Sequence, residues 1–217
     1  MAALDAAFLA ENGIYFGGGT RIVLELGEYR ESRDIDFLCA SRPGYRALRE
    51  TVSARSLGRL AGTKALKLDR EVRADQYGVR TWLALPGLTL KFEIVREGRI
   101  NLAGTSVPGL AVPCLDRPHA FAEKFLANAD RGLDASTLSR DAIDLAFMVQ
   151  AWGRESAVEG AAVAREAYGN EVDAKLDAVV RKLRGDRKYR ASCIEGMAIE
   201  DTKTLAKGFE LLARGAT

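Results

Sequence analysis

The pattern of hydrophobic and polar residues changes near residue 115. Before it, short apolar runs alternate with turns that contain Gly and Pro, which is typical of strands and short connections. After it, the chain is rich in Ala, nearly free of Pro, and apolar at helical spacing. The pattern predicts two domains: a sheet domain over residues 1–115 and a helical domain over residues 116–217.

Individual elements follow from the same pattern. A tight turn at Pro86-Gly87 between two alternating runs predicts a hairpin, and Ser139 is the predicted N-cap of a late helix. Strands are expected at 14–16, 35–40, 65–72, 78–85, 88–95 and 110–112. Helices are expected at 2–12, 21–26, 42–60, 117–130, 139–152, 155–168, 172–184, 187–195 and 202–213. The fold class is therefore α+β.

Composition places the chain among ordinary globular proteins. It has 217 residues, of which 47% are hydrophobic and 29% charged, which argues against disorder. A net charge of +2 excludes a strongly basic protein, although a local basic face is compatible with it. The chain contains no run of 18 apolar residues, and Asp5 and Glu11 stand where a signal peptide would be apolar. We expect a cytoplasmic protein.

Histidine and cysteine are too scarce for several kinds of site. The single histidine, His119, excludes a zinc site with two His ligands, and any catalytic triad would depend on it. Cys39, Cys114 and Cys193 form no CxxC pair, so we expect reduced, buried thiols. Chemistry in this chain must come from carboxylates, lysines and backbone groups, with or without a hard metal ion.

A glycine-rich segment, Gly17-Gly18-Gly19-Thr20, lies between a predicted strand and a predicted helix. Glycines let the backbone approach an anion closely, and a helix N-terminus offers free N–H groups to phosphate. No Gly-Lys-Ser/Thr follows, and Ile22 stands where a dinucleotide fingerprint has its third glycine. A plain tight turn is the alternative.

Two carboxylates flank one residue of the next strand, in Asp34-Ile35-Asp36. Residues i and i+2 of a strand point to the same side, so both carboxylates are expected on one face. A divalent cation relieves their repulsion, and Mg²⁺ favours a few carboxylates together with substrate phosphates. A solvated pair on an edge strand is the alternative.

A third carboxylate lies on the later strand over residues 88–95. Lys91 and Glu93 share its polar face, and Glu93 would join Asp34 and Asp36 if the two strands are neighbours. The alternative is an ordinary salt-bridged face.

Charged residues also recur at helical spacing in the second half. Lys124, Asn128 and Arg131 fall on one helix face. Asp141 lies three residues before Asp144 on the next predicted helix, where Arg140 and Asp144 are spaced for an ion pair. Solvated helix faces would look the same.

The order of these motifs carries more information than any one of them. The chain reads Gly18-Gly19-Thr20, then Arg30-x-Ser32-x-Asp34-Ile35-Asp36, Lys91-Phe92-Glu93, Lys124 and Arg140-Asp141-x-x-Asp144. Over residues 15–148 this resembles the AbiEii-type toxin nucleotidyltransferases of the DNA polymerase beta-like superfamily. The resemblance implies a small mixed sheet flanked by helices, followed by a helical domain that closes over the cleft.

The resemblance also implies roles for the residues. Asp34, Asp36 and Glu93 would bind Mg²⁺ or Mn²⁺, although the superfamily commonly has Asp at the position of Glu93. An NTP would be held by Gly18, Gly19, Thr20 and Lys91, with Ser32 in the same motif. Lys124 would contact its phosphates, Arg140 would pair with a carboxylate or a phosphate, and Asp141 and Asp144 would complete the last motif.

The implied reaction is Mg²⁺-dependent transfer of an NMP to an acceptor hydroxyl, which needs no histidine. The resemblance points to RNA, in particular tRNA, as acceptor, and to a toxin that has a cognate antitoxin. Residues 181–190 hold six basic residues and one acidic residue, so they are a candidate RNA contact or a solvated helix end. Transfer to a protein or small molecule, and a binding domain without turnover, are the alternatives.

Overall fold

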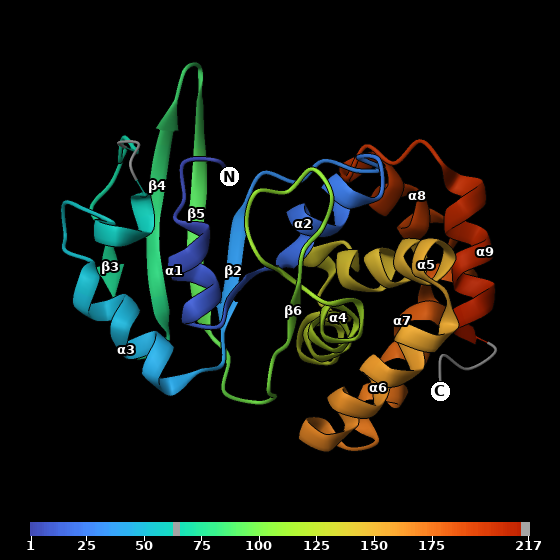
Figure 1. The fold of residues 1–217 in the computed structure, drawn as a ribbon. Helices are drawn as coiled ribbons and strands as arrows, with labels where there is room; N and C mark the ends of the chain where they lie inside the picture. Colours follow the sequence, from blue (N-terminus) through green and yellow to red (C-terminus); the bar gives the residue numbers. More distant parts are fainter. Residues whose placement is uncertain (63–65, 214–217) are drawn as a thin grey trace. The chain divides into compact units, whose positions relative to one another are not determined.

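The computed structural model describes residues 1–62 and 66–213 (Figure 1). The chain divides into two compact units. The sheet unit comprises residues 1–21 and 33–116, and the helical unit comprises residues 22–32 and 117–217. Residues 22–32 thus group with the C-terminal helices, which a single boundary near residue 115 does not anticipate.

A mixed β-sheet forms the centre of the sheet unit. In the part of the chain that the structure describes it has seven strands, in the order β3-β4-β5-β2-β1-β7-β6. Their bounds are β1 (Ile14–Phe16), β2 (Ile35–Cys39), β3 (Arg73–Ala74), β4 (Gly78–Leu85), β5 (Leu88–Arg96), β6 (Gly104–Thr105) and β7 (Cys114–Leu115). β2 runs parallel to β5 and antiparallel to β1. The expectation of an α+β fold with a small mixed sheet is confirmed.

Buried aromatic rings fix the register of the central strands. Phe16, Phe37 and Phe92 lie on β1, β2 and β5, with ring centroids 5.3 and 5.8 Å apart along the series. Each of the three is fully buried. Because strand side chains alternate, this packing turns the residues next to Phe37 and Phe92, namely Asp36 and Glu93, to the opposite face of the sheet.

Short helices accompany the sheet. They are α1 (Ala6–Glu11), α3 (Arg42–Thr51) and the 3-10 helix η1 (Gly58–Ala61). Tyr45 and Leu48 of α3 join the apolar core of the unit. The thiols of Cys39 and Cys114 are buried there and are not joined in disulfides, and burial raises the pKa of Cys39 to about 11.

The helical unit packs through small residues. α2 (Gly18–Glu25) begins in the sheet unit and ends in this one. The others are α4 (Arg117–Arg131), η2 (Ala135–Thr137), α5 (Arg140–Trp152), α6 (Arg154–Tyr168), α7 (Glu171–Gly185), α8 (Arg187–Gly196) and α9 (Thr202–Ala213). At Gly208 a Cβ atom would lie 2.3 Å from the Ala146 carbonyl oxygen, so glycine is required where α9 meets α5. No described helix has the length and hydropathy of a membrane span.

Several predicted boundaries were wrong. The helix predicted over 2–12 begins only after Asp5, whose side chain caps it, and the helix predicted over 21–26 begins three residues earlier. The helix predicted over 42–60 ends at Thr51, because Val52 is extended and Ser53 and Ser56 form a backbone turn. Ser139 stands at the N-cap position of α5 as predicted, but its side chain makes no cap bond, since its hydroxyl bonds to the Gly132 carbonyl oxygen and to Tyr189.

Two predicted strands were also wrong. Within the predicted strand over 65–72, residue 65 lies outside the described residues, and the others contribute only a single bridge from Leu68 to Leu83. No strand forms at 110–112; the strand begins after Pro113 as β7, which lies between β1 and β6, and the Pro113 carbonyl oxygen accepts from the Phe16 N–H. Proline cannot donate to a ladder, so pairing on β7 starts beyond it.

Candidate active site

The carboxylates predicted from the sequence meet at the centre of the sheet unit. Asp36 on β2 and Glu93 on β5 are direct neighbours in the parallel register. Asp34 lies two residues before Asp36, just ahead of β2. Asp34, Asp36 and Glu93 are all partly exposed, so solvent and ligands can reach this face.

The start of α2 packs against the same two aspartates. Gly17 donates to the Asp36 carbonyl oxygen (2.9 Å), and Thr20 donates through its hydroxyl to the Asp34 carbonyl oxygen. Gly18 has φ +67°, and a Cβ atom there would stand 2.6 Å from Asp36 Oδ2. Glycine therefore lets the helix N-terminus lie directly against the Asp36 carboxylate.

Glu93 is held by two cations. Arg80 Nε donates to its Oε1 (2.5 Å) and Lys91 Nζ to its Oε2 (2.6 Å). Burial raises the pKa of Glu93, but Lys91 and Arg80 outweigh it, so the pKa lies below its usual range. Glu93, and less strongly Asp36 and Asp34, raise the pKa of Lys91.

This donor set fits a divalent cation with two protein ligands. Mg²⁺ is commonly held by one or two carboxylates plus substrate phosphates, and Asp34 and Asp36 supply such a pair. Glu93 already satisfies Arg80 and Lys91. Within residues 1–62 and 66–213, no group of three Asp, Glu, His or Cys side chains is placed to hold a metal ion. Among the described residues, Glu93 thus bonds to two cations and completes no three-carboxylate cluster with Asp34 and Asp36.

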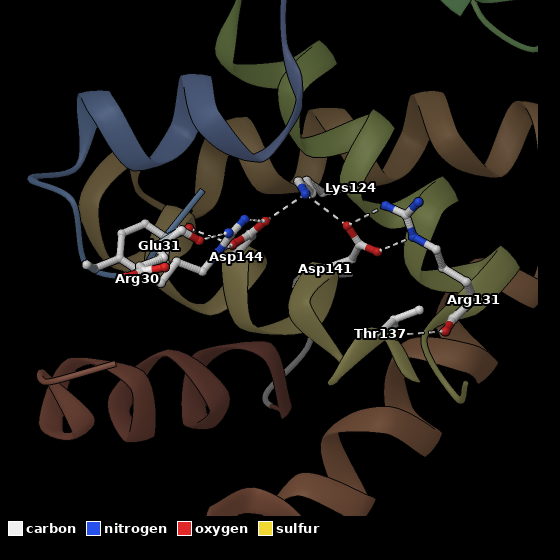
Figure 2. A network of polar contacts seen from close by, with 8 residues as sticks. Arg30, Glu31, Lys124, Arg131, Thr137, Asp141 and Asp144 are labelled. Atoms are coloured by element: carbon white, nitrogen blue, oxygen red, sulfur yellow. Dashed lines mark hydrogen bonds and ion pairs between the residues drawn. The ribbon is translucent and has the colours of Figure 1, made fainter. Parts of the chain in front are cut away.

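A second set of predicted residues meets inside the helical unit. Lys124 on α4 bonds to Asp141 (2.8 Å) and Asp144 (2.6 Å) on α5 (Figure 2). The side chains of Lys124, Asp141 and Asp144 are 7%, 1% and 0% exposed. Lys124, expected to contact phosphate, is here enclosed between two carboxylates.

Other residues extend this buried network at both ends. Arg30 binds Asp144 through Nε (2.7 Å) and Nη2 (2.8 Å), and the Tyr29 hydroxyl donates to Asp144 as well (2.6 Å). At the other end, Arg131 Nε donates to Asp141 Oδ2 (2.7 Å), as Figure 2 shows. Each carboxylate therefore accepts from at least two cationic side chains.

The network fixes the charge of its members. Burial raises the pKa of Asp141, but Lys124 and Arg131 overcome it and hold the pKa well below the usual range. The pKa of Asp144 is lowered likewise, because Lys124 and Arg30 outweigh burial. Burial lowers the pKa of Lys124, and the two aspartates raise it above its ordinary value. All three groups are ionised at neutral pH.

The remaining predicted residues lie outside these two groups of contacts. Gly19 lies in the first turn of α2, and Ser32 is half-buried at the end of residues 22–32. Arg140 is exposed, and Asp144, its expected partner, bonds to Arg30 and Lys124 instead. The structure thus assembles one group of predicted residues in each unit.

Sequence reasoning missed Arg80 and Tyr29. The turn at Pro86-Gly87 sets the hairpin register, which places Arg80 opposite Glu93 and could have revealed that ion pair. Tyr29 has no such signal, because 115 residues separate it from Asp144 and only the fold joins them.

Comparisons with solved structures identify the fold. JHP933 from Helicobacter pylori matches with a TM-score of 0.56 at 14% identity, over 96% of this chain and 87% of that one. A second H. pylori chain, whose name assigns it provisionally to the nucleotidyltransferases, matches with a TM-score of 0.57 at 16% identity, over 96% and 90%. At these identities the likeness shows a shared fold of the nucleotidyltransferase type. A comparison with curated proteins gives no significant match.

A comparison with models of protein families then identifies the family. The model of the nucleotidyl transferase AbiEii toxin, type IV toxin–antitoxin system, matches residues 1–208. This chain belongs to the AbiEii nucleotidyltransferase toxin family. The resemblance inferred from the order of its motifs is confirmed.

Proposed function

We propose that this protein transfers an NMP from an NTP to a hydroxyl of an RNA acceptor, with tRNA as the expected acceptor, and that the reaction depends on Mg²⁺. Family membership supports the nucleotidyltransferase class. The observation that carries the proposal is the Asp36 carboxylate, which Gly18 allows to lie against the N-terminus of α2, with Asp34 joined to the same helix through Thr20. Carboxylates next to a helix N-terminus suit a cation that is shared with phosphate groups.

The candidate site residues of the sheet unit each have a part in this reaction. Asp34 and Asp36 would hold the cation, which neutralises charge on the attacking and leaving oxygens. The first N–H groups of α2 lack partners within the helix and would donate to phosphate oxygens. Lys91 adds positive charge, and Glu93 keeps Lys91 in place. The acceptor oxygen bonds to the α-phosphorus, pyrophosphate leaves, and the hydroxyl proton is lost to water.

Lys124 and Asp141 are also required for transfer in this proposal, so substitution of either should stop the reaction. Because both are buried in one ion-pair network, their removal also affects folding. Their role is therefore tested at a temperature where each variant is folded, by comparing kcat with the fraction of folded protein.

The main test is a label-transfer assay. Purified protein is incubated with each of the four α-labelled NTPs, Mg²⁺, and either total tRNA or a protein extract. We expect label in tRNA, lost in Asp36→Asn and in EDTA. Asp69→Asn is the matched control, since Asp69 is an exposed carboxylate of the same unit with no part in the proposed site.

The other outcomes decide between the alternatives. Label found only in protein would replace the RNA acceptor with a protein. NTP binding without transfer, unaffected by Asp36→Asn, would indicate a binding domain. The toxin role has its own test, in which overexpressed wild type arrests growth and Asp34→Ala does not; equal growth of both strains would contradict it. Co-expression with a neighbouring antitoxin gene should restore growth.

A further inference from the structure

A groove lined by arginines lies in the sheet unit, outside the site described above. It has a volume of about 710 Å³. Arg42, Arg46 and Arg49 of α3 line it together with Arg96, the last residue of β5. Glu50 is the one carboxylate among the described residues that line it. The lining therefore carries a formal charge of +3.

Local structure explains why these arginines share one surface. Positions 42, 46 and 49 are spaced i, i+4 and i+7, so they form one row along α3, about 10 Å long at 1.5 Å per residue. Buried Leu48 anchors the other side of α3, and buried Tyr45 lies next to the row and also lines the groove. Arg96 lies 5.9 Å from the centre of the Tyr45 ring, which places its guanidinium group beside the row.

The charge in this groove is not neutralised within the chain. In the part of the chain that the structure describes, none of the four guanidinium groups forms an ion pair. Arg30, Arg80 and Arg131 show the contrast, since each binds a carboxylate at 3.1 Å or less. Four arginines beside a single carboxylate leave an excess of positive charge, which favours binding of an anion.

We propose that this arginine groove binds the phosphate backbone of the RNA acceptor, an inference that rests on the proposed function. Guanidinium groups match phosphate geometry through paired N–H donors, and a row of them along a helix fits a polyanion with regular spacing. The groove contributes to affinity for the acceptor but not to sequence specificity, because contacts to the phosphate backbone carry no base information.

Its position separates the groove from the NTP site. Arg96 pairs with Cys39 in the β2–β5 register, three residues beyond the pair Asp36 and Glu93. Three residues of strand span about 10 Å, and an odd offset turns the side chains to opposite faces. The groove therefore holds a part of the acceptor that is distant from its reacting hydroxyl. Its contribution to affinity should be larger for a long RNA than for a short one.

The basic residues 181–190 are a weaker candidate for the same role. Arg190 donates to the Leu183 and Arg184 carbonyl oxygens at the end of α7, and Lys182 lies 3.7 Å from the centre of the Tyr189 ring. Arg190 and Lys182 therefore already interact with carbonyl oxygens and an aromatic ring of the same segment, which leaves fewer of its cations to bind phosphate.

Binding of fluorescein-labelled total tRNA without NTP tests the groove at several salt concentrations. In Arg46→Ala/Arg49→Ala we expect roughly tenfold weaker binding, and a salt slope reduced by about 1.5, because each phosphate contact contributes roughly 0.7 to 0.9. Arg46→Lys/Arg49→Lys should restore the slope. The pair Arg181→Ala/Arg184→Ala tests the rival segment, and Lys203→Ala/Lys207→Ala on α9 is the control for lost charge.

Transfer of label to tRNA is measured on the same variants. A raised KM for tRNA with unchanged kcat in the groove variant supports the proposal. Unchanged affinity and slope would overturn it, even if wild type transfers label to tRNA. Displacement of tRNA by poly-glutamate at equal charge would also overturn it, in favour of an acidic polypeptide. If wild type transfers nothing to tRNA while the groove variant alone loses binding, the proposed function fails and the groove stands as an RNA-binding site.

Discussion

The two units treat their carboxylates in opposite ways. In the sheet unit, Asp34 and Asp36 are partly exposed at the edge of a helix N-terminus. In the helical unit, Asp141 and Asp144 are buried and surrounded by cations. Exposure leaves the first pair available to a ligand, while burial commits the second pair to the fold. The same residue type is therefore open to solvent in one unit and enclosed by ion pairs in the other.

Removing one member of the buried network should have the largest effect. Asp144→Ala leaves Lys124 and Arg30 buried without their shared carboxylate, so we expect the free energy of unfolding to fall by about 3–5 kcal/mol. Urea denaturation measures this change. Asp69→Ala is the control in the sheet unit, where we expect less than about 0.5 kcal/mol. Equal losses in both variants would abolish the distinction between the units.

Asp34→Asn and Asp36→Asn should show the reverse pattern. We expect each to lower kcat for transfer by about a hundredfold, equivalent to about 2.7 kcal/mol, because each removes one charged ligand of the cation. The free energy of unfolding should stay within about 0.5 kcal/mol of wild type. A large loss of stability without a specific loss of kcat would show that these aspartates stabilise the fold and do not take part in the reaction.

Acid should weaken the helical unit through the buried aspartates. Their folded pKa values lie below the ordinary value of 3.8, so they stabilise the fold above that pH, and this contribution is lost as the pH falls through the folded values. Removing one such carboxylate in Asp141→Asn should lower the slope of unfolding free energy against pH, below pH 4, by up to about 1.4 kcal/mol per unit. Urea titrations at several pH values measure it, and identical slopes in wild type and variant would contradict it.

The ion pairs of Glu93 should contribute least to stability. Arg80 is 36% exposed, so Arg80→Ala should lower the free energy of unfolding by only about 0.2–1 kcal/mol. Because it removes one of the two cations that lower the pKa of Glu93, that pKa should rise toward its ordinary value. Carboxyl NMR reports the shift, and Arg73→Ala on β3 should leave it unchanged.

The sequence predicted what depends on local pattern. The glycine-rich segment was correctly placed between a strand and a helix. Alternation predicted that Glu93 lies on the polar face of its strand, whereas its position beside Asp36 depended on the pairing of β2 with β5, which the sequence left open. The turn after Thr51 was missed because its cause is the conformation of Val52, which no periodic pattern records. The partners of Asp144 were missed for a different reason, since Tyr29 and Arg30 are brought to it by tertiary packing. The roles of the site residues stay predictions until they are measured.

The path of the chain between the units constrains how this protein can be divided or recombined. Residues 22–32 belong to the helical unit but are encoded within the first part of the chain. A fragment that starts at residue 117 would lack Arg30 and leave Asp144 with one cation fewer. Neither unit can therefore be exchanged between relatives at a single crossover point, and the two should be inherited as one module.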